Sequence, residues 1–311
     1  GWEYKEDFST GTKAAIAGGY TTVLDMPNNP DPIITPQSLE NKIKLAGNKI
    51  YSDLGFHFGG IVQAIPYFNI VKDKVFGLKV YMNHTTGPLL VEDQKELENI
   101  FSSWHKIIMV HAEEETLKKA IDLARQFGTK LHVCHVSLKT QVEEIKKAKK
   151  ENMQITSEVT CHHLFLTEED VKRLGNFGIM RPPLASKENH DALWAGINDG
   201  TIDMIASDHA PHTKKDKEKV VNGVPGLETS LPLLLTAMSE GRITREKLIE
   251  ITSINPRKIF NIPEQKDTYV EIDPDISYQI SDVSLQTKAG WTPFEGMKVA
   301  GKIQRVILRG R

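Results

Sequence analysis

The sequence has few cysteines, no long apolar run and almost no excess of charge of either sign. Its 311 residues include only Cys134 and Cys161, which argues against a disulfide scaffold and favours a reducing compartment such as the cytoplasm. No apolar run reaches the ~18 residues that a membrane-spanning helix needs. The formal net charge of −2 gives no bulk attraction to nucleic acid or to a membrane surface. We therefore expect a cytoplasmic protein with neither nucleic acid nor membrane as a partner.

The composition is that of an ordinary globular protein, with 39% hydrophobic and 26% charged residues. A chain of this length can bury the core of one large α/β domain. It begins at Gly1 without an initiating methionine, and its pattern is typical of the middle of a protein. We expect a further segment upstream of Gly1 in the natural protein.

Apolar strand patterns alternate with helical patterns along most of the chain. The predicted strands comprise residues 20–26, 56–62, 75–81, 107–110, 130–136, 154–159 and 202–207. The predicted helices comprise residues 10–17 with Ser9 as the cap, a segment opening at Thr35-Pro36, and residues 114–127, 140–151 and 190–198. Such alternation favours a parallel sheet. Because polar residues follow many different strands, we predict a (β/α)8 barrel of the TIM type that lacks its first strand in this chain. An open doubly wound sheet is the alternative.

The end of the chain has a different pattern. From about residue 264 the sequence becomes irregular, and residues 303–308 alternate like an antiparallel strand. We predict that residues 1–263 form strands two to eight of the barrel and that residues 264–311 complete a small accessory β domain. The charge run from Lys214 to Lys219 is interpreted as a solvated loop.

Three candidate metal ligands occur in or directly after apolar strands. Lys79 lies inside the apolar run 75–81, where an unpaired ammonium is costly. Carboxylation by carbon dioxide would turn it into an anion that can bridge two metals, whereas a lysine that extends to the sheet edge is the simpler alternative. His111 and His135 each end a strand and are 24 residues apart, about one β/α unit. A single such histidine is usually structural, but two at the same end of one barrel favour zinc binding.

The most specific short motif is Ser207-Asp208-His209-Ala210-Pro211-His212, which follows the last predicted strand. Asp208 faces the mouth of the predicted barrel, where a carboxylate can bind a metal and also move a proton during hydrolysis. The alternative is an aspartate that caps a helix in an ordinary turn. The neighbouring histidines and proline favour the catalytic interpretation.

Other polar residues suggest substrate contacts. Asn28 follows the strand of residues 20–26 and offers both a donor and an acceptor. Arg181, held before two prolines, is suited to bidentate carboxylate recognition, although a surface salt bridge is an equal alternative. The segment 214–226 ends in Pro225-Gly226 and could cover the barrel mouth as a mobile loop. Glu158 is a candidate metal ligand or a neighbour of the ligands. His162 and His163 are adjacent, so at most one should face the site.

At these residues the chain resembles the dihydroorotases of the cyclic amidohydrolase superfamily, particularly the dihydroorotase domain of the animal multifunctional pyrimidine enzyme. The resemblance covers almost the whole chain. Its motifs lie at residues 11–28, 77–83, 111–113, 132–136, 158–166, 181–184, 206–212, 226–236 and 291–296.

The resemblance implies a TIM-type barrel with two zinc ions bridged by carboxylated Lys79. It implies His111 and His135 as ligands of the second zinc, and Asp208 as ligand of the first and as general acid–base. Substrate contacts implied by the family are Asn28, Arg181, His212 and the backbone of Pro225 and Gly226. Thr85 and Thr86 fall in the family's flexible catalytic loop, but Thr86 stands where the animal domain has an aromatic residue. A third metal near Cys134 and Glu158 occurs in some relatives.

The largest departure from the family concerns its first strand. The family carries a His-x-His pair and a substrate-binding arginine there, in a motif that runs into a Pro-Gly resembling the position of Gly1. None of these three residues is in the 311-residue chain. A first metal held by Lys79 and Asp208 alone should bind weakly, so this form is expected to be metal-poor and inactive.

The implied reaction is the reversible cyclisation of N-carbamoyl-L-aspartate to L-dihydroorotate in pyrimidine biosynthesis. The partner hypotheses that accompany it are a homodimer and aspartate carbamoyltransferase. One alternative is another cyclic amidohydrolase, such as a dihydropyrimidinase, hydantoinase or allantoinase. A second alternative is a non-catalytic relative that serves as a structural partner.

Overall fold

The computed structural model describes residues 2–47 and 49–311, and its central feature is an array of parallel strands. Strand β1 pairs in parallel with β2, and β3 to β8 form a second, six-stranded parallel sheet in chain order. Only His57 separates β2 from β3. The strand bounds are β1 Thr22–Asp25, β2 Asp53–Phe56, β3 Phe58–Gly59, β4 Leu78–Tyr81, β5 Ile108–His111, β6 Leu131–Val133, β7 Ile155–Thr160 and β8 Met204–Ala206.

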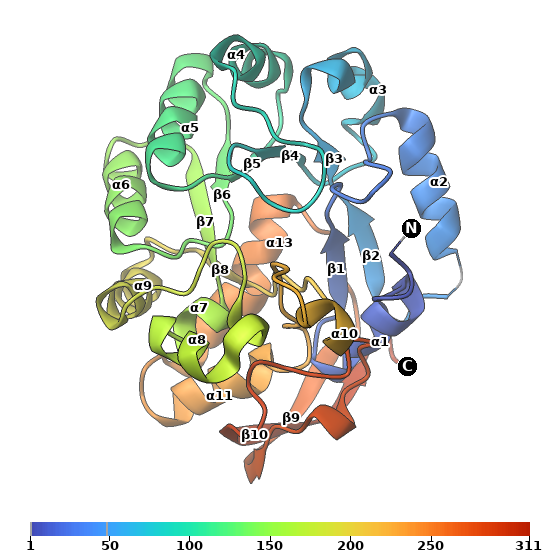
Figure 1. Cartoon of the computed structure of the whole chain (residues 1–311), viewed down its shortest axis with the longest axis vertical. Helices are drawn as coiled ribbons and strands as arrows, with labels where there is room; N and C mark the ends of the chain where they lie inside the picture. Colours follow the sequence, from blue (N-terminus) through green and yellow to red (C-terminus); the bar gives the residue numbers. More distant parts are fainter. Residues whose placement is uncertain (1, 48) are drawn as a thin grey trace.

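Most of the helices lie on the outside of these strands (Figure 1), whereas Phe260 of α13 (Asn255–Phe260) packs against the rings of His57 and His132. The longer ones are α1 Phe8–Ala17, α2 Pro36–Ala46, α4 Gln94–Ser103, α5 Glu114–Phe127, α6 Lys139–Lys150, α9 Lys187–Asp199 and α11 Ser230–Ser239. The shorter ones are α3 Phe68–Val71, α7 Cys161–Phe165, α8 Glu168–Leu174, α10 Lys214–Lys217, α12 Arg245–Ile249 and α13 Asn255–Phe260. Four further short segments complete them: the 3-10 helices η1 Val62–Tyr67, η2 Gly175–Gly178 and η4 Asp282–Ser284, and the π-helical segment η3 Glu250–Ile254.

Local sequence explains where several helices begin and end. The Thr35 side chain accepts from the amide of Ser38 and Pro36 occupies the first turn of α2, as the sequence predicts. Helix α5 has the predicted bounds and ends at Gly128 in the left-handed conformation. The prediction that Ser9 caps the first helix was wrong. Asp7 caps α1, because its carboxylate accepts from the Thr10 amide while the Thr10 hydroxyl accepts from the Asp7 amide.

The α/β class with a parallel sheet is confirmed, with all predicted strand regions close to observed ones. The second predicted strand, residues 56–62, was placed too far toward the C-terminus, because the observed strand β2 already begins at Asp53. Among the described residues, β1 has hydrogen-bonded strand pairing only with β2, and β8 only with β7. Strands β4 and β5 are buried along their whole length and carry the core between the helices.

The end of the chain is more regular than its sequence indicates. β9 (Tyr269–Gln279) pairs in antiparallel fashion with β10 (Lys298–Ile307), which contains most of the predicted strand 303–308. The two form a separate sheet at one end of the molecule (Figure 1). Within the part of the chain that the structure describes, no helix is long and apolar enough to span a membrane.

Candidate active site

One large cavity lies at the carboxyl ends of the parallel strands, and nine of the predicted site residues line it. Parallel strands bring their carboxyl ends to the same edge of a sheet, so residues far apart in sequence meet there. Lys79 is in β4, His111 ends β5, and His135 and Asp208 follow β6 and β8. The nine lining residues are Asn28, Lys79, Thr85, His111, His135, Glu158, Arg181, Asp208 and His212.

His111 and His135 face each other in the cavity wall. Their Nδ1 and Nε2 atoms, respectively, are 2.9 Å apart, and both side chains are buried. Nδ1 of His135 has no hydrogen-bond partner, and Nε2 of His111 faces the Glu113 carboxylate, whose Oε1 atom lies 3.4 Å away. Burial lowers the pKa of His111 and lowers that of His135 well below its usual range, which favours neutral imidazole. Neutral imidazole is the form that binds zinc, so the pair has the chemistry of two metal ligands.

Lys79 is buried between these histidines and the core, as the sequence predicts. Its side chain is 2% exposed, and Nζ lies 5.1 Å from the centre of the Tyr81 ring. Among residues 2–47 and 49–311, no carboxylate forms an ion pair with it. The alternative of a lysine that extends to the sheet edge is therefore wrong. A buried amine without a carboxylate partner remains a candidate for carboxylation.

Asp208 lies at a strained position of the backbone. Its φ angle is +40° and that of His135 is +36°, in the left-handed region that residues other than glycine rarely adopt. Such strain is concentrated at functional sites. Asp208 is partly exposed, but only to the cavity, and this burial raises the pKa of its carboxyl to about 7; Lys79 opposes the shift and Glu158 adds to it.

This raised pKa predicts a stability gain when Asp208 is replaced by Asn. Below about pH 4, both folded and unfolded states hold the proton and the pKa shift has no effect on stability. As the pH rises toward 7, the unfolded state ionises first, so wild-type stability falls relative to Asp208→Asn. In chelator-treated full-length protein, we expect Asp208→Asn to be more stable by about 2 kcal/mol at pH 8, allowing for partial exposure, and by less at pH 5. Urea unfolding at both pH values measures this; equal differences would contradict the raised pKa.

Glu158 of β7 is held in place by a second buried histidine. The Nε2 atom of His132 lies 3.0 Å from Oε2 of Glu158, and its Nδ1 lies 2.8 Å from the Thr156 hydroxyl. Strand alternation predicts that His132 and Cys134 pack in the core, and both are buried there. Cys134 lies in an apolar cluster with Met109 and Met204 and also borders the cavity. His162 and His163 are both buried and neither lines the cavity.

The residues present fit one metal position and part of a second. Among the described residues, no group of three or more His, Cys, Asp or Glu side chains could hold a metal ion. The two buried imidazoles would supply two ligands, with the Glu113 carboxylate 3.4 Å from Nε2 of His111, and a carboxylated Lys79 would add an oxygen ligand. Lys79 and Asp208 alone would remain for the second position.

The loop after β1 lies against the loop after β4. The Asn28 side-chain amide donates to the carbonyl of Thr86 at 2.9 Å. Gly87, with φ +99°, lies so close that an added Cβ would be 2.6 Å from the Asn28 carbonyl oxygen. Lys42 fixes the other side, because its ammonium lies 2.5 Å from the Asp25 carboxylate and donates to the Met26 carbonyl at 2.9 Å. The position of Asn28 therefore depends on both loops.

Arg181 and His212 lie at the mouth of the cavity. Arg181 is exposed and forms no salt bridge within the described part of the chain, which argues against the surface-salt-bridge alternative. The pKa of Glu113 is nevertheless lowered by its contact with His111 and, less strongly, by the nearby Arg181 charge. The imidazole of His212 is held on both sides. Lys5 donates to its Nδ1 at 3.1 Å, and its Nε2 contacts the Asn222 carbonyl at 2.9 Å. Arg181 is thus left free for an anionic ligand.

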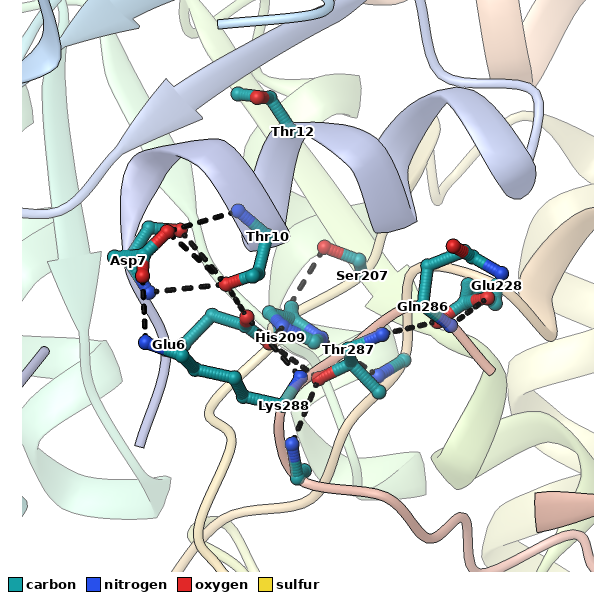
Figure 2. Close-up of polar contacts among 12 residues, drawn as sticks. Glu6, Asp7, Thr10, Thr12, Ser207, His209, Glu228, Gln286, Thr287 and Lys288 are labelled. Atoms are coloured by element: carbon teal, nitrogen blue, oxygen red, sulfur yellow. Dashed lines mark hydrogen bonds and ion pairs between the residues drawn. The ribbon is translucent and has the colours of Figure 1, made fainter. Parts of the chain in front are cut away.

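Pro225 and Gly226 lie behind the cavity wall. They line a small neighbouring pocket, and the Gly226 amide donates to His209 Nδ1 at 3.2 Å instead of pointing into the large cavity. In Figure 2, His209 lies beside Glu6, whose carboxylate also contacts the hydroxyls of Thr10 and Thr287. The chain start and the C-terminal segment therefore support the turn that follows Asp208.

The sequence does not reveal Lys5, Glu6 or Lys42 as contributors to the site. Lys5 and Glu6 reach residues more than 200 positions away, at His212 and His209. Lys42 stands in an ordinary amphipathic helix. Of the residues that support the site, only His209 could have been found from the sequence, because it belongs to the motif around Asp208.

Comparisons with known proteins give one consistent result. The model of the amidohydrolase family matches residues 3–311. The chain is 42% identical to the multifunctional protein CAD of Squalus acanthias over 318 residues, which cover 100% of this chain but only 14% of that protein. It is 39% identical to the dihydroorotase of Pyrococcus horikoshii, covering 99% of this chain and 75% of that protein.

Solved structures share the fold. The L-hydantoinase (dihydropyrimidinase) of Arthrobacter aurescens superposes with a TM-score of 0.93 at 28% identity, over 98% of this chain and 79% of that one. An inactive dihydroorotase-like domain from the CAD-like multifunctional protein of Chaetomium thermophilum gives a TM-score of 0.82 at 25% identity, over 99% and 89%. Both active and inactive relatives therefore have this architecture.

Proposed function

Because this chain belongs to the amidohydrolase family, and within it to the dihydroorotases, we propose that it forms the catalytic region of a zinc-dependent dihydroorotase. The reaction is the reversible closure of N-carbamoyl-L-aspartate to L-dihydroorotate. The observation that carries the proposal is the convergence of Lys79, His111, His135 and Asp208 on one cavity with a free arginine at its mouth. The 39% identity to a dihydroorotase over 99% of the chain supports the choice of reaction.

Zinc, when bound, would supply a Lewis acid that activates water and polarises the ring carbonyl. His111 and His135 would hold it as neutral ligands, with carboxylated Lys79 as the link to a second position at Asp208. The Asp208 carboxyl, with its pKa raised to about 7, is matched to accepting a proton from the attacking water and returning it to the ring nitrogen. Glu158, beside it, favours the protonated form.

The substrate is oriented by residues at the cavity mouth. The Arg181 guanidinium offers two parallel donors to the ring carboxylate. Asn28 supplies its side-chain carbonyl as an acceptor, because its side-chain N–H already donates to the Thr86 carbonyl. His212, locked between Lys5 and Asn222, presents a fixed ring face rather than a free donor. These contacts explain why a carboxylated ring would be preferred.

A side-by-side assay on full-length protein tests the substrate. We expect ring opening of dihydroorotate to exceed that of dihydrouracil, which lacks the carboxylate. Arg181→Met should raise KM for dihydroorotate roughly 100-fold, since a bidentate ionic contact contributes about 1.5–3 kcal/mol, and leave dihydrouracil unaffected. Arg173→Met, on the exposed surface of α8, is the control. A wild-type protein that prefers dihydrouracil would favour a dihydropyrimidinase, and inactivity on both would favour a non-catalytic relative.

The wider architecture, the partners and the location belong to the same proposal. If β2 and β3 count as one strand interrupted at His57, the parallel strands number seven, and they would be part of a (β/α)8 barrel with an eighth strand between β8 and β1, which the L-hydantoinase superposition supports. Residues 264–311 would complete an accessory β domain. The chain spans about a seventh of the multifunctional protein it matches, 14%. Association with other pyrimidine enzymes such as aspartate carbamoyltransferase, homodimerisation and a cytoplasmic location are therefore proposals.

A further inference from the structure

Lys217 is the one member of the charge run 214–219 that is fully buried. Its side chain is 0% exposed, whereas Lys214, Lys215 and Lys219 are exposed. The interpretation of this run as a wholly solvated loop was wrong. Residues Lys214–Lys217 form helix α10, capped by the Thr213 hydroxyl, which accepts from the Asp216 amide. The helix directs Lys217 inward and its neighbours outward.

The buried ammonium is satisfied by backbone alone. Nζ donates to the carbonyls of Ile179 at 3.0 Å, Val221 at 2.9 Å and Gly223 at 3.1 Å. Three acceptors match the three donors of an ammonium. Nζ also lies 5.6 Å from the centre of the buried Trp291 ring, whose indole donates to the His212 carbonyl at 2.7 Å. Burial lowers the pKa of Lys217 to about 8, yet the full set of acceptors favours the charged form.

The three carbonyls belong to the two segments that lead to the cavity mouth. Ile179 precedes Arg181 by two residues, and Gly223 itself lines the cavity together with Asn222. The segments also meet directly, because the Gly223 amide donates to the Ile179 carbonyl at 3.1 Å. Lys217 does not line the cavity. It can therefore affect a ligand only through these segments.

We propose that Lys217 is a positioning residue that joins the Arg181 segment to the 221–226 segment and thereby sets the carboxylate-binding side of the cavity. The expected change in KM rests on the proposed function, whereas the expected change in local structure does not. Without the ammonium, the carbonyls of Val221 and Gly223 lose this donor, and that of Ile179 keeps only the Gly223 amide. Leaving such acceptors unpaired is costly. The two segments would then be joined by the Gly223–Ile179 hydrogen bond without the ammonium, so the Arg181 fork would be held less firmly relative to the rest of the site.

The test compares Lys217→Met with Lys215→Met in full-length protein. Lys215 lies on the same helix but is exposed and does not line the cavity. Lys217→Met should raise KM for dihydroorotate roughly ten-fold with a much smaller change in kcat, and should hardly affect dihydrouracil. In an Arg181→Met background the same substitution should add little, because its effect acts through Arg181. Lys215→Met should match wild type throughout.

Hydrogen exchange gives a readout that does not depend on the substrate. Lys217→Met should speed exchange of the amides of residues 179–181, 221–224 and 226, with α5 unchanged. Unchanged exchange in these segments would overturn the proposal. So would a double variant in which the KM increase from Lys217→Met adds fully to that from Arg181→Met. If wild type does not act on dihydroorotate, the proposed function fails while the exchange result still decides this inference. If Lys217→Met does not fold, Lys217→Gln replaces it; failure of both to fold would show a role in the whole fold and overturn the local one.

Discussion

Replacing Asp208 with asparagine should reduce kcat for dihydroorotate by about 10²–10⁴-fold, the usual contribution of a general acid–base group. Asparagine keeps the size and much of the hydrogen bonding of aspartate but cannot take or return a proton. The backbone at this position has φ +40°, which asparagine tolerates well, so the fold should survive. As argued above, the variant should even be more stable than wild type at pH 8.

The measurement is kcat in both directions of the reaction, with urea unfolding on the same samples. Asp199→Asn is a matched control, since this carboxylate lies at the end of α9 and pairs with Lys146 on the surface. Its activity should equal that of wild type. Retention of more than about a tenth of wild-type activity by Asp208→Asn, a difference of under ~1.4 kcal/mol in the barrier, would exclude the acid–base role.

Replacing Lys79 with arginine should abolish both metal binding and turnover. The reasoning depends on the sign of the charge. An arginine keeps the positive charge of an ordinary lysine but cannot form the carbamate that would make position 79 an anionic ligand. If Lys79 acted as a cation, Lys79→Arg would preserve much of its effect. Burial of Lys79 beside two neutral imidazoles, with no carboxylate ion pair among the described residues, favours the anionic form.

The corresponding experiment measures zinc content of full-length protein reconstituted with and without bicarbonate. Wild type should bind more zinc when bicarbonate is present, and Lys79→Arg should bind little in either case. Lys106→Arg, at an exposed salt bridge with Asp73, provides the control. Carboxylation of this lysine would be refuted if bicarbonate did not change zinc binding by wild type and Lys79→Arg bound as much zinc as wild type.

The positions of Lys79, His111, His135 and Asp208 could be predicted from sequence because each lies in or directly after an apolar strand. Once the strands are parallel, their carboxyl ends must share one edge. The helix of residues 114–127 was equally clear, since Gly128 ends it in the left-handed conformation. These predictions depend only on local pattern and on one rule of topology.

Features that depend on long-range contacts could not be predicted in this way. Lys217 belongs to a run of charges that is typical of a solvated loop, and its three acceptors come from residues 179, 221 and 223. The Gly226 amide donates to His209 and not to a ligand, and this contact likewise depends on how two distant turns pack. Asp7 and Ser9 are both competent helix caps two residues apart, and only the reciprocal bonds with Thr10 distinguish them.

The account is tested most directly by removing and restoring zinc while the interconversion of L-dihydroorotate and N-carbamoyl-L-aspartate is followed in full-length protein. We predict that chelated protein is inactive in both directions, that zinc with bicarbonate restores turnover, and that His135→Ala protein does not recover. Equal turnover by the chelated and zinc-loaded enzymes, or full recovery of His135→Ala, would contradict a metal centre built on this cavity.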